Sequence, residues 1–114
     1  MITLYGIPNC DKIRRARKWL SDHNIDYRFH DFRKDGLNEK QLKQWIKQIG
    51  WEILLNKRGM TWRKLDDETK NNIDEKSAMK IMLDNPAIIK RPVLEAGKIL
   101  EVGFDEDRYR ELLG

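Results

Sequence analysis

The stretch "YGIPNCDKIRRARKWL", residues 5–20, joins an extended segment to a basic helix and carries the only cysteine of the chain, Cys10. The residues before it, 2–5, are β-branched, aliphatic or aromatic, and the run stops at Gly6, as strands do. Apolar residues then recur with the spacing of one helix face, at Ile13, Ala16 and Leu20. The stretch therefore predicts a strand, a loop and a helix, with Cys10 at the junction of loop and helix.

Strand patterns return on both sides of the middle of the chain. The run "IDYRFHDF", residues 25–32, alternates well enough to predict a second strand. A strand, a helix and a strand in this order form a βαβ opening with parallel pairing. The segment "RPVLEAGKILEVG", 91–103, predicts a hairpin that turns at Gly97. Residues 104–113 predict a closing helix capped by Asp105.

The middle of the chain has helical patterns instead. Asn38 with Gln41 three residues later is a capping signal, and apolar residues with helical spacing follow it. Further short helices are expected up to residue 85, and no linker rich in Gly, Ser or Pro bounds this region. We therefore expect a single domain of α/β class. It is a βαβ–ββα core, 1–35 and 86–114, with a helical insertion at 36–85.

Composition limits the classes of function. The net charge is +4, from 23 Lys and Arg against 19 Asp and Glu, and such a small excess does not by itself indicate nucleic-acid binding. One cysteine excludes an internal disulfide and suits a reducing compartment. The sequence shows no signal-peptide pattern and no apolar run long enough to span a membrane. We expect a cytoplasmic protein without a membrane partner.

Cys10 has two interpretations. At the start of a helix, free N–H groups and the helix dipole stabilise a thiolate, and Lys12 and Arg14 add positive charge. A lone cysteine is, however, also common as a small buried apolar residue. Position and charge alone leave both interpretations open. His23 and His30 with a single cysteine form no recognisable metal-ligand spacing, so we predict no metal site.

A distant segment of the chain is also a candidate. In "NPAIIKRPVLE", residues 85–95, Pro92 comes immediately before a predicted strand. A proline cannot donate a ladder hydrogen bond and is confined to sheet edges, strand starts or special turns. In a βαβ–ββα fold the Arg91–Pro92 step would face the loop between the first strand and the first helix. By itself the segment also fits a plain turn proline beside a surface arginine.

Four blocks of the chain resemble the ArsC family, which groups arsenate reductases, Spx regulators and YffB-like proteins. In chain order they are "LYGIPNCDKIRRARKWL", "LLNKRGMTWRKL", "NPAIIKRPVL" and "VGFDEDRYRELL". The block "LLNKRGMTWRKL" is most similar to the YffB-like members. The resemblance implies a thioredoxin-like (glutaredoxin-like) fold with a helical insertion. It also implies that Cys10 is the active-site cysteine and that the Arg91–Pro92 bond is cis and faces it.

The chain departs from two branches of that family. Arsenate reductases hold the oxyanion with three arginines, of which Arg91 matches one. The other two positions fall on Asn56, with Arg58 two residues away, and on or near Val102. An oxyanion site needs several fixed donors, so arsenate is a poor substrate. Spx regulators often carry a Cys-x-x-Cys switch, in which Ile13 here takes the place of the other cysteine.

The chain therefore carries a single thiol without a partner thiol. Such a thiol forms a mixed disulfide with its substrate, and a thiol from another molecule must then reduce that disulfide. The resemblance to YffB-like proteins implies a glutathione-dependent thiol–disulfide reductase acting on an unknown disulfide or oxidised substrate. Glutathione would be the external reductant, with no tightly bound cofactor. The alternative is a non-enzymatic, Spx-like adaptor that binds RNA polymerase. If the protein is an enzyme, Cys10 is catalytic, and the residues expected to bind glutathione or a substrate anion are Asn9, Lys12, Arg14, Arg91 and Pro92.

Overall fold

A computed structural model of the protein describes residues 2–114. The chain forms two compact units. We call the first, 2–35 with 91–114, the sheet unit and the other, 36–90, the helical insert. The second unit ends at 90, five residues later than the end expected for the insert. The expectation of a single domain stays a prediction.

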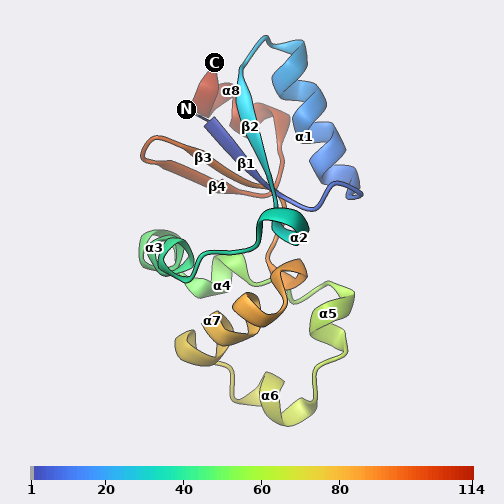
Figure 1. Ribbon diagram of the computed structural model, residues 1–114, viewed down its shortest axis with the longest axis vertical. Coiled ribbons are helices and arrows are strands. Elements are labelled where there is room, and N and C mark those ends of the chain that lie inside the picture. Colours follow the sequence, from blue (N-terminus) through green and yellow to red (C-terminus); the bar gives the residue numbers. More distant parts are fainter. Residues whose placement is uncertain (1) are drawn as a thin grey trace. The chain divides into compact units, whose positions relative to one another are not determined.

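The sheet unit contains one mixed sheet of four strands in the order β2-β1-β3-β4 (Figure 1). The first two strands pair in parallel, and the remaining neighbours pair antiparallel. This is the predicted βαβ–ββα order, and the α/β fold class is confirmed. The strands are β1 (Ile2–Gly6), β2 (Tyr27–Asp31), β3 (Val93–Ala96) and β4 (Ile99–Val102).

Two helices, α1 (Asp11–Asp22) and α8 (Glu106–Leu113), pack with the strands around one hydrophobic core. The tight turn between β3 and β4 uses Gly97, whose φ of 61° is the left-handed conformation expected for this hairpin. The core brings apolar side chains of the sheet and both helices together. Its fully or nearly fully buried members are Leu4, Ala16, Trp19, Leu20, Leu94 and Tyr109.

β2 ends earlier than the alternating pattern predicts. Asp31 is buried, and its carboxylate accepts a hydrogen bond from the backbone N–H of Arg33 at 2.8 Å. This contact starts a short helix, α2 (Phe32–Asp35), in place of further strand. The side-chain bond therefore takes Phe32 out of the strand and into the helix.

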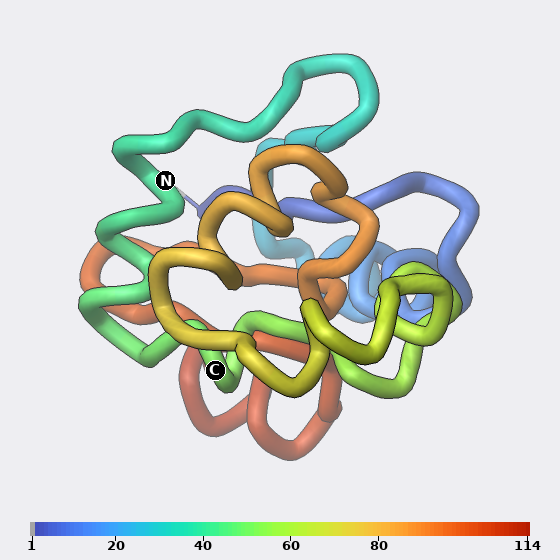
Figure 2. Tube along the Cα trace, turned by 90° about the horizontal axis from the view of Figure 1, so that it is seen from below, coloured from blue at the N-terminus to red at the C-terminus, as the bar shows by residue number. Residues whose placement is uncertain are grey.

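The helical insert is built from short helices, whose path can be followed in Figure 2. Three of them begin at side chains that accept backbone N–H hydrogen bonds, Asn38, Asp66 and Asp74. The predicted cap at Asn38 is confirmed. The helices are α3 (Glu39–Ile49), α4 (Trp51–Leu54), α5 (Met60–Arg63), α6 (Asp67–Asn71), α7 (Glu75–Asp84) and the 3₁₀ helix η1 (Pro86–Ile88).

Residues 86–90 belong to the insert because of backbone hydrogen bonds. The N–H of Asn56 donates to the carbonyl of Ile88 at 2.9 Å, and the N–H of Lys90 donates to the carbonyl of Leu54 at 2.8 Å. An isolated antiparallel bridge joins Leu55 and Ile89. These pairs explain the later boundary, since the sequence pattern of 86–90 gives no sign of a partner at 54–56. Within residues 2–114, no helix has the length and apolar character needed to cross a membrane.

Candidate thiol site

Strand pairing brings three chain segments to one end of the sheet. β1 ends at Gly6, and Tyr5 beside it pairs with Val93 at the start of β3. Val93 pairs in turn with Val102, the last residue of β4. The loop that follows β1, the residues that precede β3 and the loop that follows β4 therefore meet at the same end. Cys10 lies in the first of these segments, and the Arg91–Pro92 step precedes β3.

Cys10 is the N-cap residue of α1, with the extended backbone angles φ −111° and ψ 133° that such residues adopt. Its carbonyl accepts the first helical hydrogen bond, from the N–H of Arg14 at 3.0 Å. The side chain makes no capping hydrogen bond and is partly exposed. The N–H groups of the first helical turn have no intrahelical acceptor, so they can stabilise a negative charge on the sulfur.

Gly6 allows the end of β1 to approach both α1 and the segment before β3. A Cβ atom at this position would collide with the side chain of Ile13, which is fully buried. The same Cβ position lies 4.0 Å from the Cβ of Arg91. The absence of a side chain at Gly6 thus lets β1, α1 and Arg91 come into contact. Arg91 therefore lies next to Gly6, where the loop that carries Cys10 begins. That its side chain faces Cys10 stays a prediction.

The Arg91–Pro92 bond is cis, the isomer that the family resemblance implies. Pro92 is buried, and its carbonyl accepts a hydrogen bond from the N–H of Gly103 at 2.8 Å. Gly103 has a φ of 88°, which favours glycine. The Arg91–Pro92 dipeptide therefore lies between β1, at Gly6, and the loop after β4.

The other predicted binding residues occupy different surroundings. Asn9 is exposed in the turn before α1. Lys12 is exposed and lines a hollow of about 380 Å³. Arg14 is also exposed, and its guanidinium forms an ion pair with Asp11 at 3.4 Å. Such exposed pairs contribute little, about 0.2–1 kcal/mol, so Arg14 can exchange this partner for a ligand anion.

The hollow beside Lys12 contains residues that the sequence analysis did not select. Arg108 and Glu101 are ion-paired there, and their hydrogen bond raises the pKa of Arg108. The sequence could have indicated these residues, because the block "VGFDEDRYRELL" places charged residues directly after the last strand. The hollow is lined by Lys12, Glu101, Val102, Gly103, Phe104, Asp105 and Arg108.

Two positions at which the family resemblance would place arginines have other roles here. The Asn56 side chain accepts a hydrogen bond from the N–H of Arg58 at 3.0 Å and so shapes a turn within the insert. Val102 is half-buried and contributes an apolar side chain to the hollow beside Lys12. Neither side chain can donate to an oxyanion as a guanidinium does.

The histidines take part in aromatic contacts. His23 stacks on Trp19 with ring centroids 4.0 Å apart, and His30 packs against Tyr5 at 4.9 Å. Within the described part of the chain, no group of three or more His, Cys, Asp or Glu side chains is arranged to hold a metal ion.

Comparisons with known proteins agree with the family resemblance. The family model described as "ArsC family" matches residues 5–112. An uncharacterised protein of Haemophilus influenzae is 50% identical over 111 residues, which cover 96% of each chain. The global transcriptional regulator Spx of Streptococcus agalactiae is 31% identical over 99% of this chain and 83% of its own. A solved structure named YFFB is 43% identical, covers 100% of both chains and superposes with a TM-score of 0.96.

Proposed function

The chain belongs to the ArsC family, and from this premise we propose that it is a glutathione-dependent thiol–disulfide reductase with Cys10 as its only nucleophile. Family membership supports an oxidoreductase type of activity and, with the thioredoxin-like fold, a thiol reductase kind of function. The observation that carries the specific proposal is the position of the single thiol. It lies at the N-cap of α1, partly exposed, at the sheet end that also holds Arg91 and Pro92.

The proposed reaction has two exchange steps. The Cys10 thiolate attacks the glutathione sulfur of a mixed disulfide between glutathione and a substrate. The substrate thiolate leaves and takes up a proton, and Cys10 becomes joined to glutathione through a new S–S bond. The thiolate of another glutathione then attacks the glutathione sulfur of that bond. Oxidised glutathione leaves, and Cys10 is again a thiolate, so two glutathione sulfurs end in one disulfide for each substrate disulfide reduced.

The surrounding residues have separate roles in this proposal. Asn9 and the first amides of α1 stabilise the Cys10 thiolate. Arg91 pairs with a carboxylate of glutathione, and Pro92 shapes the wall next to it. Lys12 and Arg14 supply the positive field that attracts a tripeptide with an excess of carboxylates. All five flank Cys10 along the chain or at the end of the sheet.

The test is intact-mass analysis after incubation with oxidised glutathione, followed by a turnover assay. The mass should rise by one glutathionyl group, and added reduced glutathione should remove it. Catalysed release of glutathione from a glutathionylated peptide should follow, coupled to glutathione reductase and NADPH. The Cys10→Ser variant should neither take up a glutathionyl group nor catalyse the release of glutathione. A wild-type protein that takes up glutathione no faster than a free cysteine peptide would refute the proposal.

The alternative is a non-enzymatic adaptor that binds RNA polymerase, as the resemblance to Spx regulators implies. The specific observation is the 31% identity to a transcriptional regulator over 99% of this chain. The Cys-x-x-Cys switch is absent, because Ile13 replaces its other cysteine and is buried. Recovery of stoichiometric polymerase subunits from cell extract with the Cys10→Ser variant would favour the adaptor. Failure to recover them, together with glutathione turnover by the wild type, would exclude it.

A further inference from the structure

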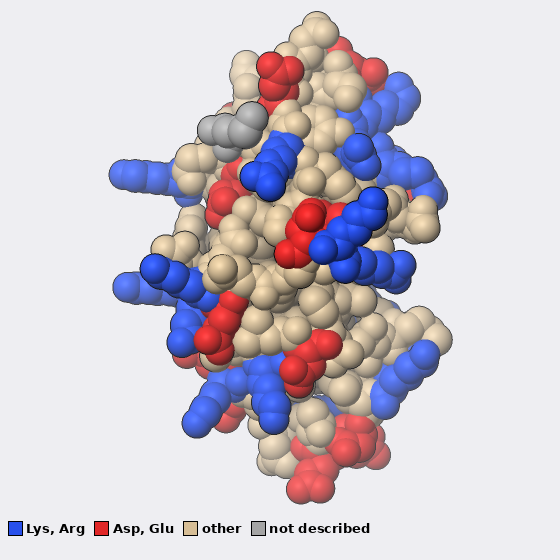
Figure 3. All heavy atoms as spheres, viewed as in Figure 1, with Lys and Arg blue, Asp and Glu red and all other residues tan. Residues whose placement is uncertain are grey.

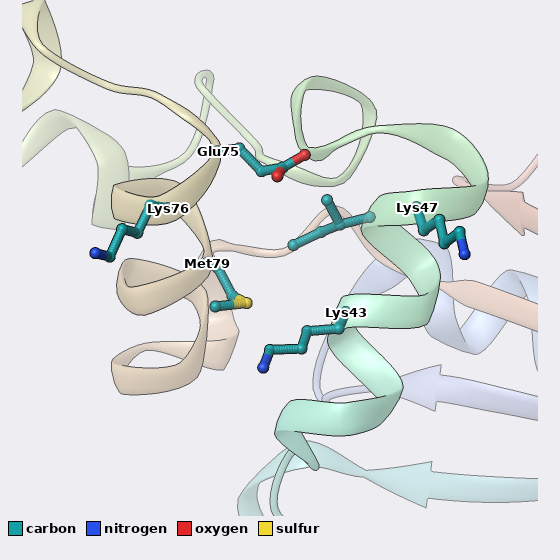
Figure 4. A pocket seen from close by; sticks show the side chains of 6 residues that line it. Lys43, Lys47, Glu75, Lys76 and Met79 are labelled. Carbon is teal, nitrogen blue, oxygen red and sulfur yellow. The ribbon is translucent and has the colours of Figure 1, made fainter.

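A groove runs between two helices of the insert, away from any predicted site residue. Helices α3 and α7 lie side by side, and the space between them measures about 530 Å³. Figure 4 shows Lys43 and Met79 extending toward one another across this space, whereas Lys47 and Lys76 extend outward from its two sides. Pockets that hold small organic groups are typically about 300–1,000 Å³, so the groove has room for large side chains.

The chemistry of the groove is an apolar floor with a basic rim. Ile46, only 7% exposed, and the partly exposed Met79 line the floor. Methionine is unbranched and polarisable, so it adapts to different apolar groups. The charged lining consists of three lysines, of which Lys43 extends across the groove, and Glu75, a surplus of two positive charges (3 − 1). Among residues 2–114 none of these lysines takes part in an ion pair.

We propose that this groove binds an acidic segment of a partner protein, with one aliphatic or aromatic side chain of that segment inserted between Ile46 and Met79. Burial of the inserted side chain supplies most of the affinity, because exposed ion pairs contribute little individually. The lysines select acidic neighbours of that side chain and speed the encounter.

A nucleic acid fits the groove less well. Single strands bind through aromatic side chains on which bases stack, and among residues 2–114 no aromatic residue lines this space. The Glu75 carboxylate would oppose a phosphate backbone. Figure 3 shows acidic as well as basic side chains on the face that it draws.

The experiment titrates isotope-labelled full-length protein with three capped peptides and follows the amide signals by NMR. The main probe is Glu-Asp-Leu-Asp-Glu, the glycine probe replaces its leucine by glycine, and the basic probe is Lys-Arg-Leu-Arg-Lys. We expect saturable shifts confined to α3 and α7 with the main probe. The glycine probe should bind about tenfold more weakly, as loss of a buried leucine side chain predicts. The basic probe should cause no shifts.

Two matched double variants distinguish binding in the groove from non-specific attraction between the peptide and the charged surface. Lys43→Glu with Lys76→Glu should weaken binding of the main probe by about fivefold or more. Lys40→Glu with Lys80→Glu, at exposed positions of the same helices outside the groove, should change binding less than about twofold. Circular dichroism must show both variants folded. Any one of five results would overturn the proposal. The first three are an absence of shifts at α3 and α7 at millimolar peptide, equal binding of the glycine probe, and equal effects of the two double variants. The other two are tighter binding of single-stranded DNA and self-association of the protein through these helices.

Discussion

Strand register dominates the fold of the sheet unit, whereas local helix caps and helix packing dominate that of the insert. In the sheet unit the register pairs Ile2 with Ala96 and Gly6 with Asp31, so distant segments fix one another. In the insert, helices begin at caps that reach only two or three residues along the chain, as at Asn38 and Asp74. This difference between the units corresponds to the two proposed sites, the thiol site of the sheet unit and the docking groove of the insert. The thiol site depends on the register of paired strands, whereas the docking groove depends on the packing of α3 beside α7.

Arsenate should not be reduced at a measurable rate. The two missing guanidinium groups leave Arg91 as the one matching ligand, and the insert contributes Asn56 in place of an arginine. The measurement is a glutathione-coupled assay with arsenate, with a glutathionylated peptide as the positive control in the same mixture. Robust arsenate turnover would show that the two missing arginines are not needed and would contradict this prediction.

One core substitution in each unit tests whether the two units unfold together. Leu94→Ala and Met82→Ala each remove a fully buried side chain, one from the sheet unit and one from α7. Each should lower the free energy of unfolding by about 2–5 kcal/mol. The predicted single domain requires both variants to shift one common transition in urea, followed by circular dichroism and tryptophan fluorescence. Two separate transitions, each sensitive to only one substitution, would contradict that prediction.

Arg91→Ala should slow glutathionylation of Cys10 by about 10- to 150-fold, the equivalent of a charge-assisted contact of about 1.5–3 kcal/mol. The thermal midpoint should stay near that of the wild type, because Arg91 is only partly buried. Arg28→Ala removes an exposed arginine of β2 in the same unit and is the control. A wild-type rate for Arg91→Ala would show that this side chain does not serve the thiol.

At high pH the protein should lose stability through one buried tyrosine of the sheet unit. Burial, with a further contribution from Glu101, raises the pKa of Tyr109 well above its usual range. The neutral phenol is therefore favoured in the folded state, and this contribution is complete below the unfolded pKa of about 10 and is lost as the pH rises above it. The Tyr109 hydroxyl has no hydrogen-bond partner among the described residues, so Tyr109→Phe should fold normally. Urea unfolding from about pH 9 upward should show a smaller decline in that variant.

At low pH the insert should show a smaller effect through a helix cap. The Ser77 N–H donates to the Asp74 carboxylate at 2.9 Å and lowers the pKa of that carboxyl. A lowered folded pKa stabilises the protein above the unfolded pKa of about 3.9, and the contribution is lost as the pH falls through the folded value. Asp74→Asn keeps a capping oxygen that does not titrate. The variant should lose less stability than the wild type in acid; an identical acid profile would show that the cap is not involved.

The sequence predicts the regular parts of both units well. Strand alternation, helix spacing and capping residues are local signals, so the first strand and helix, the cap at Asn38 and the turn at Gly97 could be predicted directly. The end of β2 at Asp31 could not be, because a side-chain hydrogen bond overrides the alternating pattern there. The same holds for 86–90, whose partners at 54–56 lie far away along the chain.

The candidate site was predictable in part. The position of Cys10 at a helix start follows from the local pattern, and the resemblance points to Arg91 and Pro92. The hollow lined by Lys12 and Arg108 was not predicted, because it depends on how the loop after β4 meets the first turn of α1. The groove of the insert was missed for a similar reason. Lys43 and Met79 are ordinary helix residues until α3 and α7 are placed beside each other.

The close approach of Gly6 and Ile13 has an evolutionary consequence. A lineage that gained a resolving cysteine at position 13 would lose the branched side chain that fills the space above Gly6. Even Ile→Val in a core costs about 0.5–1.5 kcal/mol, and cysteine is smaller still. The dithiol switch and a larger residue at position 6 should therefore be inherited together. Relatives with Cys at position 13 are expected to carry a side chain where this protein has none, and Gly6 would identify the lineages that stayed monothiol.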